Sequence, residues 1–457
     1  MKNRTMKYWQ KRIFILCWLA YTIAYLGRLN LSIAIPLMED SLTLDKTSLG
    51  FIGSLFFWAY AFGQLINGRL GDKFASRSFV FWGLLISSIL NLLFGSLTSL
   101  IFMAILWAFN GYFQSMLWGP LMKTINLWFP QKQSSKMALY MFSSVVSGFL
   151  LVWGGLGQIS SYTGWKGVFR IPGIILLIYS FIWYICMRNN PEEVGLCLED
   201  TEISSTKLDL TDTKLNYTQI EPTENKLNYT EYVLDTESGF DEKGNKSQRA
   251  SFMKLIFKTR LYLIALAGIP LGFIREGISL WAPTMLLEIF QLNLKSTMGA
   301  ALLIPLFNFM GVVVARLIII KFQDNETKLV AIFFTGGILT CVLLYFFKDS
   351  NIIVYLVLLA VCSLCLYAAS SILTSVIPQK YHMTSSVAGF LDFSIYLGAG
   401  LSGIITGFLS NRIGWNIVIL LWIIVGIAGC ICIRIKPSKR LYKTSYDVFA
   451  YNDHPDK

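Results

Sequence analysis

Two stretches, Tyr25-Leu26-Gly27-Arg28-Leu29-Asn30 and Phe273-Ile274-Arg275-Glu276-Gly277, each place an arginine deep inside a long apolar run. The first run extends from Ile13 to Leu37, and the second extends from Leu261 to Ile289. Three pairs of identical residues keep the offset of 247 that separates the two arginines: Ser32 and Ser279, Pro36 and Pro283, and Met38 and Met285. The sequence therefore predicts two repeated halves, each with one buried cation at the same place.

The composition is that of a membrane protein. Of the 457 residues, 54% are hydrophobic and only 14% are charged, whereas a soluble domain has about 25% charged residues. The apolar residues come in blocks of about 20, the length that spans a hydrocarbon core of about 30 Å. Helices satisfy their own backbone hydrogen bonds within the bilayer, so we expect an all-α integral membrane fold.

The apolar blocks are arranged as six plus six. They fall at about 13–37, 49–70, 78–97, 100–127, 136–158, 167–187, 260–289, 297–320, 328–347, 351–376, 384–409 and 414–434. We expect a six-helix half at 1–188, an acidic disordered linker at 189–255, a second half at 256–435 and a tail at 436–457.

The repeat extends beyond the arginines. Gly164-Trp165 recurs as Gly414-Trp415, and Pro130-Gln131-Lys132 recurs as Pro378-Gln379-Lys380. Because each half has an even number of helices, the two halves should share one orientation. Such parallel repeats are found in secondary transporters, which bind substrate between the halves near the midplane.

The formal net charge of +12 is unevenly distributed. The stretch 189–250 holds 14 of the 27 acidic residues, while basic residues gather at the N-terminus, in alternate short loops and in the tail. This pattern reports membrane orientation rather than a nucleic-acid partner. We predict a multi-pass protein of the plasma membrane with both termini and the linker on the cytoplasmic side.

No pattern typical of an enzyme or an ATP-driven pump is present. The chain has no Walker sequence and no catalytic constellation. Cys362 and Cys365 form a CxxC pair, but they lie in an apolar block without a nearby histidine, so we interpret them as packing residues. We expect no catalytic residue, no metal and no cofactor.

A membrane-embedded arginine is costly, and it normally faces a cavity or a partner. Matched positions would bring Arg28 and Arg275 together, where they repel unless an anion lies between them. Guanidinium forks fit phosphate oxygens in a bidentate manner, which favours a phosphate-bearing ligand. Alternatively, an acid across the bundle neutralises Arg28, and Glu276 neutralises Arg275. We disfavour the second pairing because consecutive residues on a helix do not face one another.

The segment from Gly68 to Arg77, Gly-Arg-Leu-Gly-Asp-Lys-Phe-Ala-Ser-Arg, falls in the predicted turn between the second and third helices. It resembles the glycine, acid and base signature of the major facilitator superfamily, which implies a twelve-helix fold of that type. The glycines permit tight packing at a helix end, and the acid can pair with a base or cap a helix. We predict a gating role for Gly68, Arg69, Gly71, Asp72 and Arg77.

Several other segments resemble the organophosphate:phosphate antiporters of that superfamily, the bacterial glycerol-3-phosphate and hexose-6-phosphate exchangers. These segments are Tyr25–Asn30, Gly111–Met116 with Trp118-Gly119-Pro120, Asn190–Leu196, Arg275 with Trp281–Thr284, and Tyr396-Leu397-Gly398. The resemblance covers both halves but neither the linker nor the tail. It implies a rocker-switch cycle in which Arg28 and Arg275 bind phosphate while Tyr25 and Tyr396 line the cavity.

The chain also departs from that family. Gln64, Val145 and Asn308 stand where glycerol-3-phosphate carriers have a lysine, a histidine and a glutamate, and Asp392 is an added acid. Asp392 can pair with an arginine in the empty state, form a gate salt bridge or bind substrate hydroxyls. We predict that Gln64, Gln114, Trp118, Asn308 and Asp392 contribute to the substrate-binding site.

The resulting hypothesis is a monomeric carrier in the lipid bilayer that exchanges inorganic phosphate for a small phosphorylated organic anion. With the cavity empty, repulsion between the two arginines should disfavour the closed state and so enforce exchange. One alternative is a membrane sensor that binds a sugar phosphate and signals to a kinase. Another is a facilitator for an organic anion without phosphate.

Overall fold

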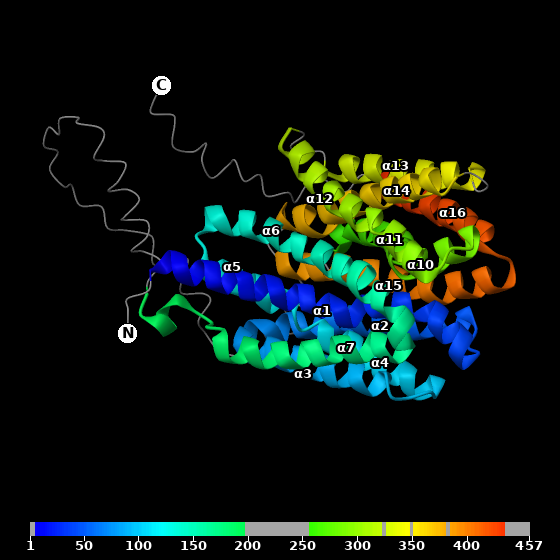
Figure 1. Ribbon diagram of the computed structural model, residues 1–457. Helices are drawn as coiled ribbons and strands as arrows, with labels where there is room; N and C mark the ends of the chain where they lie inside the picture. The colour runs from blue at the N-terminus through cyan, green and yellow to red at the C-terminus, as the bar shows by residue number, and fades with distance from the viewer. Residues whose placement is uncertain (1–4, 197–255, 322–325, 348–350, 381–383, 435–457) are drawn as a thin grey trace, which may run out of the picture.

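The computed structural model describes residues 5–196, 256–321, 326–347, 351–380 and 384–434 (Figure 1). Most of the predicted linker and all of the predicted tail at 436–457 lie outside these residues. The start of the predicted linker does have structure, because Pro191–Val194 forms a turn of 3-10 helix. Elsewhere the described residues are almost entirely helical.

The N-terminal half consists of long helices that coincide broadly with the predicted apolar blocks, although most of them extend beyond the predicted limits. They are α1 (Met6–Leu42), α2 (Lys46–Lys73), α3 (Ser76–Phe94), α4 (Leu100–Gln114), α5 (Trp118–Trp128), α6 (Gln131–Phe149), the π-helical segment η1 (Leu150–Leu156) and α7 (Gly157–Cys186). The C-terminal half repeats this plan. It contains α10 (Leu261–Phe290), α11 (Leu294–Ala301), α12 (Leu303–Lys321), α13 (Glu326–Phe346), α14 (Ile352–Ser371), η4 (Ile372–Val376), η5 (Ile377–Lys380), α15 (Thr384–Arg412) and α16 (Trp415–Arg434).

Eleven helical runs in the described residues are long and apolar enough to cross a membrane. One of them, Tyr140–Cys186, has 47 residues, about twice the length that a bilayer needs. The backbone of Gly164 interrupts this run with φ 62° and ψ −176°. Figure 1 shows α6 running to one end of the molecule and α7 returning from it. Counted as two arms, this run raises the number of spans to the twelve expected from the sequence.

The turn at Gly164 also supports the predicted repeat. Its counterpart Gly414, which precedes α16, likewise has a positive φ of 114°. Residues with a β-carbon rarely adopt such φ values, so glycine is the residue suited to both turns. Each half therefore enters its last span through a glycine turn followed by a buried tryptophan, Trp165 or Trp415.

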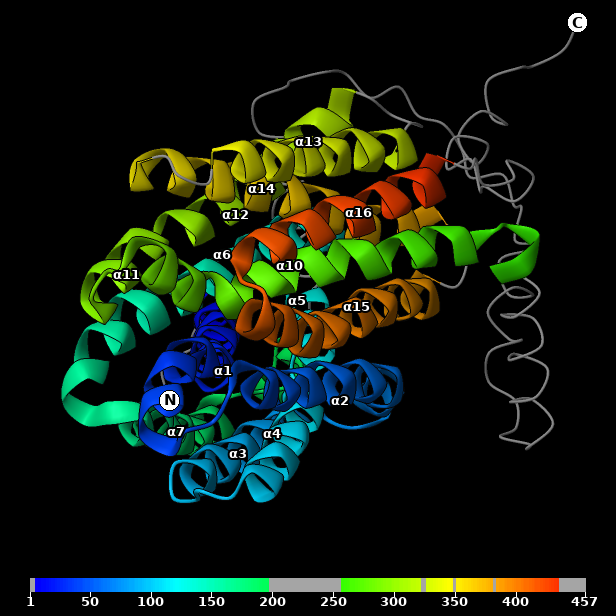
Figure 2. The same ribbon diagram turned by 90° about the vertical axis from the view of Figure 1, so that its right-hand side faces the viewer.

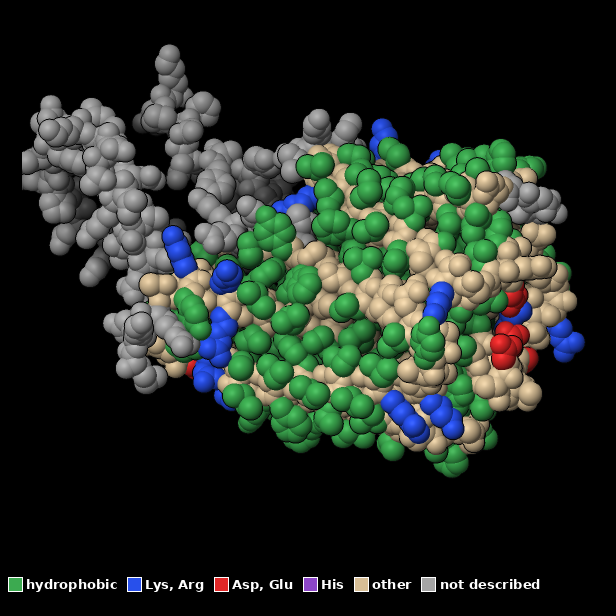
Figure 3. Space-filling model, in the orientation of Figure 1, with side chains coloured by type: hydrophobic (Ala, Val, Ile, Leu, Met, Phe, Trp, Pro, Cys, Tyr) green, Lys and Arg blue, Asp and Glu red, His purple; other side chains and the backbone are tan. Residues whose placement is uncertain are grey.

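With twelve spans, α1 begins and α16 ends at the same end of the molecule, which we call the near end. The opposite end, where α1 meets α2, is the far end. Figure 3 shows hydrophobic side chains over most of one face, with acidic side chains gathered at the right, which is the far end. The short segment between Met38 and Lys46 supplies Glu39, Asp40 and Asp45 to that end.

The two halves pack side by side, with α1 and α2 of the first half facing α10 and α15 of the second (Figure 2). At the far end, α2 and α15 approach so closely that a β-carbon on Gly50 would lie 2.2 Å from the carbonyl oxygen of Gly403. An ion pair between Lys46 Nζ and Glu288 Oε1, 2.7 Å apart, joins the halves at the same end. These contacts hold the far end closed.

Candidate anion-binding site

Arg28 lies on α1 in an aromatic cage, with only 9% of its surface exposed. Its guanidinium carbon is 5.4 Å from the ring centre of Tyr25, 5.5 Å from Phe56, 4.6 Å from Tyr60 and 5.3 Å from Tyr396. Its Nη2 also donates a hydrogen bond of 2.9 Å to the Tyr396 hydroxyl. The faces of aromatic rings attract cations, so this cage stabilises the buried charge although no carboxylate of the described residues contacts it.

Arg275, on α10, is equally buried at 8% exposure but has different neighbours. Its Nη1 donates a hydrogen bond to Ser370 Oγ. Its Nη2 lies 2.6 Å from Glu276 Oε1 and forms an ion pair with it. The guanidinium carbon is 5.2 Å from the ring centre of Tyr367 and 5.9 Å from that of Tyr396.

Tyr396 therefore contacts both arginines, as one ring lies within 6 Å of each guanidinium carbon. The two cations meet at the boundary between the halves, as their matched positions in the repeat suggested. Beside Arg28 lies a small cavity of about 20 Å³, lined by Arg28, Leu29, Ser32, Phe57, Glu276, Ser279 and Leu280. This volume holds about one water molecule. A larger ligand requires the cavity to open.

The expectation that Glu276 would not pair with Arg275 is wrong. Although the two residues are consecutive on α10, both side chains are long enough to bend toward each other. In these buried surroundings an unpaired carboxylate is costly, and that cost favours the contact. Because Glu276 neutralises Arg275, the predicted repulsion between two uncompensated arginines does not describe this state.

Three other predicted residues lie near the arginines. The ring of Tyr25 is part of the cage around Arg28. Gln64 reaches the cage indirectly, because its Nε2 donates a hydrogen bond of 2.8 Å to the Tyr60 hydroxyl. Asp392, on α15, interacts electrostatically with both arginines, but among the described residues it forms an ion pair with neither of them.

The structure does not bring Gln114, Trp118 or Asn308 to the arginines. Gln114 Nε2 donates to the backbone oxygen of Ala24 and to Ser87 Oγ, and these bonds fasten α4 to α1 and α3. Trp118 packs on Tyr21, whose ring in turn packs on Tyr25. Asn308 Oδ1 accepts a hydrogen bond from Ser363 Oγ between α12 and α14. In this state all three contribute to packing.

The predicted gating segment, Gly68 to Arg77, packs the near end of α2 and the start of α3 against α5 and α7. Gly71 packs against Pro120, where a β-carbon would lie 2.9 Å from the ring, whereas the space around Gly68 is open. Arg77 donates from its Nε to the backbone oxygen of Tyr184 and from its backbone nitrogen to Asn189. The side chains of Arg69 and Asp72 fall outside what the structure describes.

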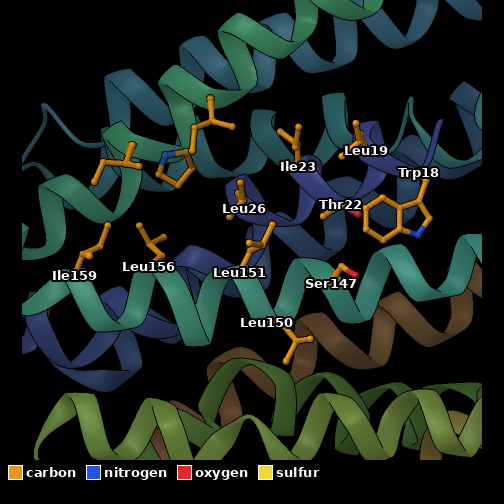
Figure 4. Close-up of a pocket in the computed structure, with 13 residues that line it drawn as sticks. Trp18, Leu19, Thr22, Ile23, Leu26, Ser147, Leu150, Leu151, Leu156 and Ile159 are labelled. Carbon is orange, nitrogen blue, oxygen red and sulfur yellow. The ribbon is translucent and has the colours of Figure 1, made fainter. Parts of the chain in front are cut away.

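A second cavity, of about 620 Å³, lies between α1, η1 and α7 (Figure 4). Its lining is almost wholly apolar, with Leu26, Leu151 and Leu156 among the residues labelled in Figure 4. None of the 13 described residues that line this cavity is charged. It therefore lacks the groups needed to bind an anion and is separate from the arginine site.

Four residues of the site were not predicted from the sequence. Phe56 and Tyr60 come from α2, and Tyr367 and Ser370 come from α14. Tyr60 precedes Gln64 by four residues on one helix, so its proximity to a predicted site residue was a usable signal. The other three show no distinguishing pattern, since aromatic and small residues are common in membrane helices.

Comparison with known proteins places this geometry in context. The sequence profile of the Major Facilitator Superfamily matches residues 17–403. The chain is 26% identical over 416 residues to the glycerol-3-phosphate transporter of Bacillus subtilis (strain 168), covering 89% of this chain and 87% of that protein. It is 23% identical over 419 residues to a probable hexose phosphate transport protein of Chlamydia pneumoniae, with 91% and 88% covered.

Two further comparisons concern a sensor and a solved structure. The chain is 21% identical over 401 residues to the membrane sensor protein UhpC of Salmonella typhimurium (strain LT2), covering 87% of this chain and 84% of that protein. Its fold is similar to the inward-facing, unoccupied crystal structure of a bacterial homologue of the human lysosomal transporter Spinster. The TM-score is 0.64 at 13% identity, with 93% of this chain and 97% of the other covered.

Proposed function

Because this chain belongs to the Major Facilitator Superfamily and is a multi-pass membrane transporter rather than an enzyme, we propose that it exchanges inorganic phosphate for a phosphorylated organic anion. The observation that carries this proposal is the convergence of Arg28 and Arg275 on Tyr396. Two buried guanidiniums from opposite halves suit an anion with several oxygens, because each fork can bind two of them.

Phosphate is the chemical group common to the ligands named for the two transporter relatives. In the proposed site the phosphate group lies between the two guanidiniums. The rings of Tyr25 and Tyr60 hold the Arg28 guanidinium in place. Gln64 then positions Tyr60 through its hydrogen bond to the hydroxyl. Asp392, which interacts electrostatically with both arginines, contacts the organic part of the ester in this proposal.

The contacts between the halves fit an alternating-access cycle. Lys46 and Glu288, together with the close approach of Gly50 to Gly403, join the halves at the far end. We place the near end and both termini on the cytoplasmic side of the plasma membrane, so this state is closed to the outside. Transport requires the far end to separate while the near end closes around the bound anion.

Labelled phosphate uptake into proteoliposomes tests the exchange directly. Vesicles loaded with unlabelled phosphate should take up label much faster than vesicles without it. A panel of glycerol, triose and hexose phosphates, added outside to compete, then identifies the ester that is exchanged. Equal uptake by loaded and empty vesicles would contradict exchange. Absence of phosphate uptake by both kinds of vesicle, together with uptake of a labelled carboxylate, would instead favour a facilitator for another anion.

Sensing is the second candidate function, favoured by the similarity to UhpC over most of the chain. The arginine site serves a sensor equally well, since both activities begin with binding of a phosphorylated ligand. A sensor would bind a sugar phosphate in detergent but show no phosphate exchange in loaded vesicles. The same preparation therefore distinguishes the two candidates.

A further inference from the structure

Glu276 is a buried carboxylate at the centre of the molecule, with 6% of its surface exposed. It contacts Arg275 at 2.6 Å and lines the small cavity that also borders Arg28. The repeat places Leu29 at the corresponding position of the first half, while Ser32 and Ser279 line the cavity as a matched pair. Glu276 therefore adds one negative charge to one side of an otherwise repeated cavity.

This carboxylate occupies the part of Arg275 that a phosphate needs. A bidentate fork uses Nη2 together with either Nε or Nη1. Nη2 already donates to Glu276 and Nη1 to Ser370, while Nε is buried without a hydrogen-bond partner in the structure. Nη2 keeps a second N–H, but a phosphate dianion that takes two bonds from this guanidinium would lie beside the Glu276 carboxylate, so the two anions compete for one positive charge.

Among the described residues, the one ion pair that Glu276 forms is with Arg275, and Arg28 also interacts with it electrostatically. The titratable and charged side chains that interact electrostatically with it come from α1, α10, α14 and α15: Tyr25, Arg28, Arg275, Tyr367, Asp392 and Tyr396. The two arginines would be engaged by phosphate, and Asp392 is itself acidic. A second anion left unpaired in this buried site is costly, and protonation removes that cost.

We propose that Glu276 holds Arg275 in the empty carrier, and that each phosphate dianion displaces it and causes it to bind one proton. This inference rests on the proposed function. In the step, the ion pair between Glu276 and Arg275 breaks, two hydrogen bonds form from Arg275 to phosphate, and the free carboxylate takes a proton from the buffer acid in solution, which becomes its conjugate base. The proton is released when phosphate leaves, so it accompanies phosphate in both directions of an exchange.

Calorimetric titration of the purified full-length protein with inorganic phosphate measures the proton directly. Titrations in two buffers of different ionisation enthalpy give the number of protons bound with each phosphate. Wild type should take up about one proton more per phosphate than the Glu276→Gln variant at the same pH, because the contribution of phosphate itself cancels in the comparison.

The pH dependence of phosphate affinity gives a second test. Above about pH 8, phosphate stays doubly charged while arginine stays protonated. In this range, the affinity of wild type for phosphate should fall by up to tenfold for each unit by which the pH rises. The affinity of the Glu276→Gln variant for phosphate should not change with pH.

Glu288→Gln is the matched control, because Glu288 is an ion-paired glutamate on the same helix but outside the cavity. It should keep the wild-type number of protons. Equal proton numbers in wild type and Glu276→Gln would overturn the proposal. Loss of phosphate binding in Glu276→Gln would also overturn it, because Glu276 would then be a required ligand rather than a competitor. A wild type that binds no phosphate would instead refute the proposed function.

Discussion

Two guanidiniums in matching positions of the repeat are stabilised by different neighbours. Arg28 lies among aromatic rings, whereas Arg275 pairs with the carboxylate of Glu276 and the hydroxyl of Ser370. A charge in a transmembrane helix is tolerated only when such partners replace water. Among the described residues, Arg28 therefore has no carboxylate in contact. At Arg275, a bound phosphate would have to compete with Glu276.

The ring of Tyr60 has the shortest distance to Arg28 in the cage, at 4.6 Å from the guanidinium carbon. Replacing it with leucine removes a cation–π interaction of about 0.5–2 kcal/mol, so the KM for phosphate should rise about twofold to thirtyfold. Tyr60→Phe keeps the ring and serves as the control, with a smaller effect expected. Initial rates of exchange in proteoliposomes measure both. If leucine and phenylalanine behaved alike, the ring would not hold Arg28.

At the scale of helices, the closed far end depends on the approach of α2 to α15. Glycines at the contact let the two backbones come together, because a β-carbon on Gly50 would overlap Gly403. The ion pair between Lys46 and Glu288 crosses the same boundary. Both features stabilise the state that is closed at the far end. Altering them should therefore change the thermal stability of the protein and its exchange rate together.

Gly50→Ala tests this packing. The added methyl group would lie 2.2 Å from a backbone oxygen, so the helices must separate. Overpacking of this kind costs about 1–3 kcal/mol, and we expect a lower Tm in detergent together with a changed exchange rate. Gly299→Ala in α11 is the matched control, since nothing lies within 4 Å of the added carbon. A Gly50→Ala protein with the Tm and rate of the control would show that the close approach does not matter.

Across the whole molecule, the twelve spans bring the start of α1 and the end of α16 to one side. We predict that both termini face the cytoplasm. Green fluorescent protein fused to the C-terminus should fluoresce, while alkaline phosphatase at the same place should be inactive, because that enzyme folds only in an oxidising compartment. An active phosphatase fusion would reverse the orientation and place the far end inside the cell.

The spans and the meeting of the arginines were predictable because each depends on a local signal, namely block length and a single repeat offset. The other aromatic neighbours of the arginines were not predictable, since Tyr60 reaches Arg28 and Tyr367 reaches Arg275 from helices whose approach depends on tertiary packing. The ion pair of Arg275 with Glu276 was missed because helical spacing gives the direction in which a side chain leaves the backbone. It does not give the position of the charged group at the end of a long side chain.

Phosphate exchange by Arg28→Lys and Arg275→Lys tests the central claim most directly. Lysine keeps the charge but cannot form the bidentate fork. Losing one hydrogen bond to a charged group costs about 1.5–3 kcal/mol, so each variant should lose at least about tenfold in kcat/KM for phosphate exchange. Arg170→Lys, at an exposed arginine bonded to Ser96, is the control and should exchange normally. Wild-type rates in both variants, with normal insertion, would contradict the assignment of these arginines as the phosphate site.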